Sequence, residues 1–247
     1  YATRLRPLTD DVPKHLLPVG ERPMLDWVLD AVRAVQEVDE IHLVTNNRFA
    51  PAFEHWGEAN GVAVYDDGTS SNEDRLGAVG DLRLAIEQAG LEDDELVVLA
   101  GDNLFDFSLD HFVEWWRAKP QPASAVPLHD VGDLELAAQY GIADTDADDR
   151  IVRFVEKPSR PASALASTLI YLVAPAHVRL VATYLEAGMS PDNAGSFLGW
   201  LAEREPVYGY RFEGSWYDIG DRAQLLEADN RLRRLAGVPE RASYSLD

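Results

Sequence analysis

Residues 95–103 read Glu-Leu-Val-Val-Leu-Ala-Gly-Asp-Asn, an apolar run that ends in a glycine, an aspartate and an asparagine. A run of this length and composition predicts a short buried β-strand. Two similar runs lie nearer the N-terminus, at residues 41–45 and 62–65. Helical patterns of apolar residues occupy the stretches around them, at residues 24–35, 77–90 and 109–118. Strands separated by helices of this length imply parallel pairing, so the sequence predicts an α/β fold.

After about residue 120 the pattern becomes richer in β-structure. The expected elements are a strand at 124–131, a hairpin of 140–144 and 150–155 across the acidic turn 146–149, one long strand at 165–173, helices near 176–187 and 194–203, a strand at 207–212 and a closing amphipathic helix at 222–235. We therefore predict a single domain over residues 1–247, with a Rossmann-like, mostly parallel sheet flanked by helices. Its second half adds β-rich insertions over the carboxyl edge of that sheet.

The composition limits the partners that this chain can have. Its net charge of -21 repels nucleic acid and anionic lipid, so we expect neither nucleic acid nor membrane as a partner. No apolar run approaches the roughly 20 residues of a membrane span. The chain has no cysteine, which excludes disulfides and thiolate metal sites. With no visible signal peptide, these features predict a cytoplasmic protein.

Two cations stand near the N-terminus on short, stiff stretches of backbone. The small residues Ala2 and Thr3 precede Arg4, and Lys14 follows Pro13. Small residues let backbone N–H groups approach a phosphate closely, while arginine offers a fork of donors and lysine a point charge. The alternative is an exposed proline-rich loop whose cations are incidental. Lysine is scarce in this chain, which argues against an incidental role for Lys14.

Two aspartates are candidates for a metal site. Asp102 directly follows the predicted strand that ends at Leu99, and ligands bind outside the carboxyl ends of parallel strands. Asp218 lies between aromatic and aliphatic neighbours, and a buried carboxylate is costly unless it is paired or bound to a metal. Together they could hold one Mg²⁺. The alternatives are a turn aspartate at residue 102 and a helix N-cap at residue 218, although Asp221 is the better candidate for that cap.

Glu156, Lys157 and Pro158 follow the predicted strand 150–155. An acid beside a cation suits a ligand that carries both hydroxyl groups and a phosphate. The alternative is a solvated strand end that the proline terminates.

The order and spacing of these motifs resemble those of the sugar-1-phosphate nucleotidyltransferases, most nearly the glucose-1-phosphate thymidylyltransferases and mannose-1-phosphate guanylyltransferases. The resemblance runs from Tyr1 to about Leu235. It is carried by Thr-Arg-Leu at 3–5, Pro-Lys at 13–14, Leu-Leu-Pro-Val at 16–19, Gly-Asp-Asn at 101–103, Glu-Lys-Pro at 156–158 and Trp-Tyr-Asp-Ile-Gly at 216–220. It implies the nucleotide-diphospho-sugar transferase fold. It also implies a Mg²⁺-dependent transfer of a nucleotidyl group from dTTP, GTP, UTP or CTP to a sugar 1-phosphate, which releases pyrophosphate.

The resemblance also implies a role for each candidate residue. Residues 1–120 would form the nucleotide-binding half and residues 121–235 the sugar-phosphate-binding half, followed by a tail at 236–247. Arg4 and Lys14 would be the catalytic cations, on the β,γ-phosphates and the α-phosphate. The remaining roles would be nucleotide binding by Ala2, Thr3, Gly80 and Asp102, sugar-phosphate binding by Gly141, Glu156 and Lys157, and Mg²⁺ binding by Asp102 and Asp218.

The chain departs from the family's pattern at its start. Ala2 stands where the family's loop normally has a glycine, and the family's first β-strand and the glycine before Tyr1 have no counterpart in the sequence. We therefore expect the protein to continue upstream of Tyr1.

The resemblance favours a glucose-1-phosphate thymidylyltransferase-like activity. Four other functions stay open at this point: a mannose-1-phosphate guanylyltransferase, a cytidylyltransferase for an alcohol phosphate such as phosphocholine, a glycosyltransferase and a non-catalytic sugar-nucleotide sensor. A glycosyltransferase would keep Asp102 but has no need for Arg4 and Lys14 in one loop. The base, the sugar and the oligomeric state, including a homo-oligomer, are open as well.

Overall fold

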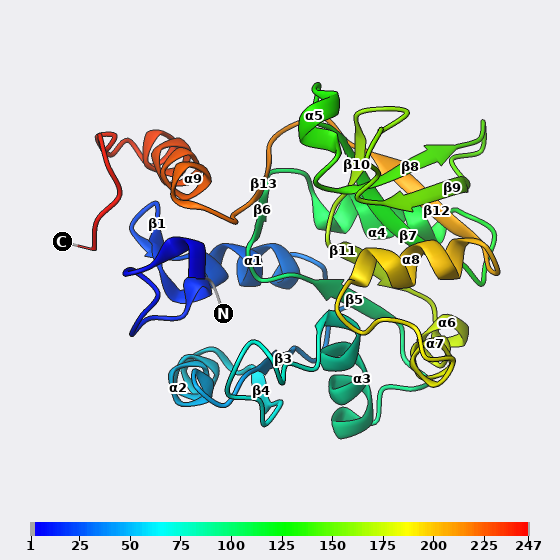
Figure 1. The fold of residues 1–247 in the computed structure, drawn as a ribbon, viewed down its shortest axis with the longest axis horizontal. Coiled ribbons are helices and arrows are strands. Elements are labelled where there is room, and N and C mark those ends of the chain that lie inside the picture. Colours follow the sequence, from blue (N-terminus) through cyan, green and yellow to red (C-terminus); the bar gives the residue numbers. More distant parts are fainter. Residues whose placement is uncertain (1–2, 247) are drawn as a thin grey trace.

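The computed structural model describes residues 3–246 and shows helices packed around a central sheet (Figure 1). The elements in chain order are the 3₁₀ turns η1 (Thr3–Leu5) and η2 (Lys14–Leu16), followed by β1 (Pro18–Val19), β2 (Arg22–Pro23), α1 (Met24–Arg33), β3 (His42–Thr45), α2 (Ala50–Asn60), β4 (Ala63–Asp66), α3 (Ala78–Ala89), β5 (Leu96–Leu99), β6 (Asn103–Phe105), α4 (Leu109–Arg117), β7 (Ser124–Asp130), α5 (Leu134–Ala137), β8 (Gly141–Thr145), β9 (Ile151–Glu156), β10 (Leu165–Ser167), β11 (Ile170–Val173), α6 (Pro175–Val178), α7 (Leu180–Glu186), α8 (Ala194–Ala202), β12 (Val207–Arg211), β13 (Trp216–Asp218) and α9 (Arg222–Leu235).

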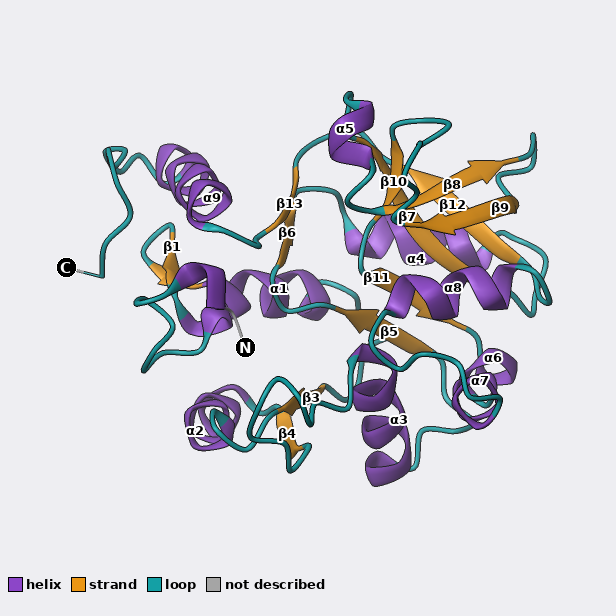
Figure 2. Ribbon diagram, in the orientation of Figure 1, coloured by secondary structure: helices purple, strands orange, loops and turns teal. Residues whose placement is uncertain are grey.

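The central sheet confirms the predicted α/β class but is mixed rather than mostly parallel. Its strand order is β5-β11-β7-β10-β8-β9, and β12 pairs with β7 (Figure 2). Among the described strands, only the pairs β3–β4 and β7–β12 are parallel. Strands β8 and β9 form the predicted hairpin, and a short connection of this kind can only join antiparallel strands. The predicted parallel pairing is therefore confirmed for β3 and β4, which the helix α2 connects.

Alternate residues of the central strands pack against helices on opposite faces of the sheet. In β7, Val126 and Leu128 pack in one apolar cluster with residues of α3, α7 and α8, whereas Ala125 packs in another with residues of α1 and α4. In β11, Tyr171 belongs to the first cluster and Leu172 to the second. This period of two follows from the pleat, which turns successive side chains to opposite faces. Both faces of the sheet are therefore covered by helices.

The single long strand predicted at residues 165–173 is wrong, because the chain changes partners in its middle. β10 pairs with β7 and β8, whereas β11 pairs with β5 and β7. Between the two strands, the backbone N–H and side-chain hydroxyl of Thr168 both donate to the carbonyl of Pro127. The N–H of Ala100 donates to the carbonyl of Leu169. These contacts come from distant parts of the chain, so the apolar run alone could not reveal the break.

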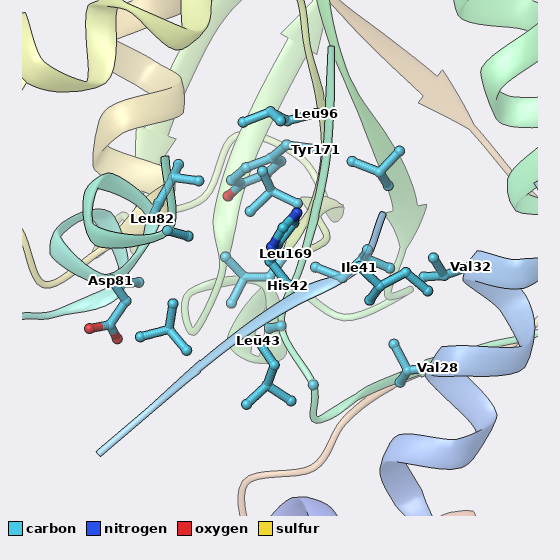
Figure 3. A pocket seen from close by; sticks show the side chains of 18 of the residues that line it. Val28, Val32, Ile41, His42, Leu43, Asp81, Leu82, Leu96, Leu169 and Tyr171 are labelled. Carbon is cyan, nitrogen blue, oxygen red and sulfur yellow. The ribbon is translucent and has the colours of Figure 1, made fainter. Parts of the chain in front are cut away.

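A cavity of about 1060 Å³ lies among α1, α3, β3 and β5. Apolar side chains such as Val28, Leu43 and Leu96 line it (Figure 3). Within residues 3–246, β3 pairs only with β4 and β5 only with β11, and all four residues of β5 are just half-buried. Lys14 and Asp102 are also among the residues that line this cavity.

The C-terminal helix begins where the sequence indicates. The carboxylate of Asp221 accepts hydrogen bonds from the N–H groups of Ala223 and Gln224, and so caps α9. After α9, the hydroxyl of Tyr244 donates to the carbonyl of Pro18 at 2.6 Å, which brings the tail against β1. Across residues 3–246, no helix has the length and apolar character that crossing a membrane requires.

Candidate active site

Lys14 joins three parts of the chain that are far apart in sequence. Pro13 is buried and extended, and it directs Lys14 into the short turn η2. The Lys14 ammonium donates to a carboxylate oxygen of Asp102 and, at 2.9 Å, to the backbone carbonyl of Ile219. Both the Lys14 and the Asp102 side chains are largely buried. An ammonium has three donors, and among residues 3–246 only these two acceptors contact it, so within the described part of the chain one N–H of Lys14 is left for a ligand.

The two predicted metal-binding aspartates lie at the ends of two neighbouring strands, Asp102 just before β6 and Asp218 at the end of β13. β6 and β13 pair in antiparallel fashion with Asn103 opposite Asp218, and the N–H of Ile219 donates to the carbonyl of Asp102 at 3.2 Å. The indole of Trp216 donates to the side-chain oxygen of Asn103 at 2.7 Å, which fixes this strand pair. The structure therefore brings Asp102 and Asp218 together beside Lys14.

The neighbouring charges shift the two aspartates in opposite directions. Although burial acts to raise the pKa of Asp102, Lys14 and His15 hold it below its usual range. Burial, followed by the negative charge of Asp102, raises the pKa of Asp218 to about 6. Within residues 3–246 no side chain donates a hydrogen bond to the Asp218 carboxylate. Asp218 is thus an under-compensated acid beside a second carboxylate.

This pair of acids suits a divalent cation. Mg²⁺ is usually held by one or two carboxylates together with phosphate oxygens and water, so it needs no larger protein cluster. The described residues contain no group of three or more His, Asp or Glu side chains arranged to hold a metal. The raised pKa of Asp218 is the observation that favours an added positive charge here, because that charge would offset the repulsion from Asp102.

Arg4 lies on the same side of the site. It is exposed in η1, and its guanidinium approaches Gly220, where a β-carbon would lie 3.9 Å from it. Gly220 directly follows Ile219, whose carbonyl holds Lys14. Arg4 and Lys14 therefore both lie against the loop at Ile219 and Gly220. Ala2 lies outside the described residues, and for Thr3 only the backbone, at the start of η1, is described.

The glycine-rich segment at the start of α3 lies on another wall of the cavity. Gly77 has a φ of +82°, and a β-carbon there would come within 2.6 Å of the carbonyl oxygen of Pro191. Gly80 follows in the first turn of α3, where a β-carbon would meet Leu76 at 3.0 Å. Gly77 and Asp81 line the cavity together with Lys14, and Figure 3 shows Asp81 among its apolar side chains.

Glu156, Lys157 and Gly141 meet at the ends of β8 and β9. Gly141 stands opposite Glu156 in the hairpin, and a β-carbon on Gly141 would lie 2.8 Å from the Glu156 carboxylate. Lys157 is exposed and has a φ of +45°, a left-handed conformation that is unusual for a residue other than glycine. Burial raises the pKa of Asp218, and the positive charge of Lys157 partly offsets that rise, so Lys157 lies within electrostatic range of this carboxylate.

Two further residues, His15 and Tyr140, belong to this site although no role was predicted for them. His15 contacts Gly101, and burial followed by the Lys14 charge lowers its pKa to about 4, so its ring is neutral at pH 7. Tyr140 packs on Trp216 with ring centroids 4.9 Å apart, beside Asp218. Each adjoins a quoted motif, but its neighbours come from distant parts of the chain and leave no local sequence signal.

Asp81 gives a testable pH dependence of stability. One of its carboxylate oxygens is buried with no hydrogen-bond partner among the described residues. Burial and the charge of Asp67 raise the pKa of Asp81 to about 6, so its ionised form destabilises the fold above that pH. Allowing for partial solvent screening, we expect Asp81→Asn to raise the free energy of unfolding by about 1–2 kcal/mol at pH 8. Near pH 4 most of the gain should disappear, because the wild-type carboxyl is then protonated in the folded state and no buried charge remains to be relieved.

Urea unfolding of the wild type and the variant at both pH values measures this effect. Asp94→Asn, at an exposed aspartate, is the matched control and should change stability little at either pH. An equal effect of Asp81→Asn at pH 4 and pH 8 would contradict the assignment to the buried charge.

Comparison with known proteins agrees with this geometry. The family model described as "Nucleotidyl transferase" matches residues 1–234. The chain is 29% identical to a mannose-1-phosphate guanyltransferase of Candida albicans, over 92% of this chain and 60% of that protein. It is 30% identical to a UTP–glucose-1-phosphate uridylyltransferase of Synechocystis, over 88% of this chain and 57% of that protein. The chain thus spans about three-fifths of the length of these curated relatives.

The fold has a close counterpart among solved structures. A Bacillus anthracis protein, provisionally assigned as a glucose-1-phosphate thymidylyltransferase and solved in complex with a sucrose, matches with a TM-score of 0.79 and 25% identity. The match covers 94% of this chain and 91% of that one, and it confirms the predicted nucleotide-diphospho-sugar transferase fold. The family model matches nearly the whole of this chain. The chain therefore belongs to the nucleotidyl transferase family.

Proposed function

We propose that this protein transfers a nucleotidyl group from a nucleoside triphosphate to a sugar 1-phosphate, giving an NDP-sugar and pyrophosphate. The observation that carries this proposal is the position of the Lys14 ammonium between the Asp102 carboxylate and the Ile219 carbonyl, with one donor left for a phosphate. The family membership and the names of the relatives support the same reaction class. We propose that residues 1–120 bind the nucleotide and residues 121–235 the sugar phosphate.

The reaction requires positioning and charge neutralisation rather than proton transfer. A phosphate oxygen of the sugar 1-phosphate attacks the α-phosphorus of the nucleotide in line. The new bond joins that oxygen to the α-phosphorus, and the bond from the α-phosphorus to the bridging oxygen breaks, with its electron pair leaving on pyrophosphate. Because the attacking oxygen is already an anion, no general base is needed. The protein must therefore bring two polyanions together and stabilise the negative charge that develops between them.

Three cations of this chain divide that task. Lys14 donates to the α-phosphate as charge builds on it, and its two protein contacts keep the ammonium in place. Arg4 binds the β,γ-phosphates and stabilises the leaving pyrophosphate. Lys157 binds the phosphate of the incoming sugar, while Glu156 accepts hydrogen bonds from sugar hydroxyls. The backbone at Gly141 contacts the sugar, and the turn at Gly80 faces the base and ribose.

We propose Mg²⁺ as the cofactor, held by Asp102 and Asp218. A divalent cation bound there would neutralise charge on the phosphate oxygens and on the attacking group. Asp102 keeps its lowered pKa through Lys14, so it is ionised and available as a ligand at neutral pH.

We favour a thymidylyl group and glucose 1-phosphate as the substrates, which is a narrower choice than the names of the relatives support. The relatives carry guanyl, uridylyl and thymidylyl names, so the base requires measurement. Pyrophosphate release should be measured for dTTP, GTP, UTP and CTP, each with glucose 1-phosphate, mannose 1-phosphate and phosphocholine. Release with dTTP and glucose 1-phosphate above all other pairs supports the proposal. Release only with phosphocholine, or sugar transfer from an NDP-sugar without pyrophosphate, would replace it.

Removal of the Lys14 ammonium should abolish most activity without unfolding the protein. We expect Lys14→Ala to lower kcat at least 100-fold, because a charge-stabilising donor of this kind contributes about 10²–10³ in rate. Asp102→Asn should have a similar effect. Pyrophosphate release with the best substrate pair measures the loss, and circular dichroism checks the fold.

The control is Lys119→Ala. Lys119 is paired with Asp149 at 2.7 Å and packs over Trp115, so its loss should leave turnover unchanged. Near-normal turnover in both Lys14→Ala and Asp102→Asn would refute the assignment of these two residues.

Asp218 should determine the affinity for the metal. We expect Asp218→Asn to raise the Mg²⁺ concentration that gives half-maximal turnover by about tenfold or more, because one of the two proposed ligands loses its charge. EDTA should remove wild-type activity, and added Mg²⁺ should restore it. Asp221→Asn is the neighbouring control, since asparagine preserves the cap of α9. A normal Mg²⁺ requirement in Asp218→Asn would exclude Asp218 as a ligand.

A further inference from the structure

The Glu156 carboxylate is held from one side by a residue that the motifs do not include. The side-chain amide of Asn193 donates to Oε1 of Glu156 at 2.7 Å. Glu156 ends β9, and Asn193 immediately precedes α8, 37 positions later. Among residues 3–246, no side chain donates a hydrogen bond to the second oxygen, Oε2. One oxygen is therefore fixed by the protein, and the other keeps its capacity to accept from a ligand.

Two glycines leave the space that this carboxylate occupies. A β-carbon on Gly195 would lie 1.9 Å from Oε2 of Glu156, and one on Gly141 would lie 2.8 Å from it. One turn further along α8, a β-carbon on Gly199 would lie 2.9 Å from the ring of Phe154. The missing side chains allow α8 to pack directly on the face of β9 that carries Phe154 and Glu156. No larger residue could stand at 195 without displacing the carboxylate.

Both ends of the Asn193 side chain are in use, which fixes its orientation. Its oxygen accepts from the N–H of Gly195 at 2.9 Å and so caps α8, while its amide nitrogen faces Glu156. Since the oxygen must face the N–H donor, the amide N–H groups must face the carboxylate. Asn193 thereby fixes the Glu156 carboxylate relative to the N-terminus of α8.

The segment before Asn193 also contacts the nucleotide half. The N–H of Val79 donates to the carbonyl of Pro191 at 2.9 Å, and Gly77 packs against Pro191 and Asp192. Residues 191–195 therefore lie between the glycine-rich turn of α3 and Glu156. A general distortion of this segment would disturb both substrates, whereas the loss of the single bond to Glu156 would disturb only the sugar side.

We propose that Asn193 is a positioning residue for sugar recognition. It holds Oε1 of Glu156 so that Oε2 accepts a hydrogen bond from a hydroxyl group of the sugar ring. This inference rests on the proposed function, because it takes the ligand of Glu156 to be a sugar 1-phosphate. Asn193 lies outside the Glu-Lys-Pro motif, and its hydrogen bond provides a way to orient Glu156 that the motif itself does not contain.

The test separates the two hydrogen bonds of Asn193. Asn193→Ser retains an oxygen that can cap α8 but is too short to reach Glu156. We expect it to raise the KM and the Kd for the sugar 1-phosphate about tenfold, the loss typical of one hydrogen bond to a charged group. The KM for the nucleotide should stay within twofold and the Tm within about 2 °C. Asn193→Ala, which also removes the cap, should add a loss of stability.

Two further variants complete the test. Gly195→Ala, which fills the space of the carboxylate, should weaken sugar binding at least as much as Asn193→Ser. In a Glu156→Ala background, Asn193→Ser should cause no additional loss, because the group that it positions is gone. Calorimetric titration with sugar 1-phosphate gives the Kd values independently of turnover.

The outcomes distinguish this inference from the proposed function. If the wild type releases no pyrophosphate but binds sugar 1-phosphate, the function fails and the Kd values still decide the role of Asn193. An unchanged sugar Kd in Asn193→Ser would overturn the inference. So would equal weakening of both substrates, additive losses with Glu156→Ala, or no binding of sugar 1-phosphate by the wild type.

Discussion

The contact of the Lys14 ammonium with Asp102 and Ile219 is the constraint on which the rest of the site depends. It joins the N-terminal segment to residues 88 and 205 positions away. Without it, three loops with high configurational freedom would have to be ordered independently, and the cost of ordering rises with every residue that is fixed. A buried ammonium is tolerated only when its charge is paired and its donors are satisfied. Within residues 3–246 the protein meets that requirement with two acceptors and leaves the third donor available.

The same ammonium affects the pKa values of two neighbouring carboxylates to different extents. Asp102 touches Lys14 and titrates below its usual range, whereas Asp218 feels the negative charge of Asp102 more strongly than the positive charge of Lys14. Two like charges in one partly buried place cannot both be ionised without cost. Lys14 offsets that cost mainly for Asp102, whereas burial and the remaining repulsion raise the pKa of Asp218. A single lysine thereby creates a site that favours an additional cation.

Local signals in the sequence predicted the elements that local interactions determine. The hairpin of β8 and β9, the helix α9 and its cap at Asp221 all follow from residues that are close along the chain. The break between β10 and β11 does not follow from residues that are close along the chain. It arises from the contacts of Thr168 with Pro127 and of Leu169 with Ala100.

The same distinction applies to the site. The sequence supplied the motifs, yet the bond from Asn193 to Glu156 depends on how α8 packs on β9. The two small residues that allow this packing, Gly195 and Gly199, stand in an otherwise ordinary helical pattern. Close approach of a helix to a strand is a property of the folded pair and not of either segment alone. Such contacts escape any analysis that considers one element at a time.

The distribution of ion pairs bears on how an acidic protein would bind the two polyanions of the proposed reaction. Many of its surface arginines are bound to acids, as in the pairs Arg83–Glu87 and Arg231–Asp106. Within residues 3–246, neither Arg4 nor Lys157 forms an ion pair, although both are exposed in a chain with a net charge of -21. A phosphate that binds either of them displaces no carboxylate, so its binding energy is not reduced by a broken pair. Under the proposed function, Arg4, Lys14 and Lys157 would together offer an anion three cations within an otherwise acidic surface. The net charge of the chain would then repel polyanions in general, whereas Arg4, Lys14 and Lys157 would bind them at the site of the proposed reaction.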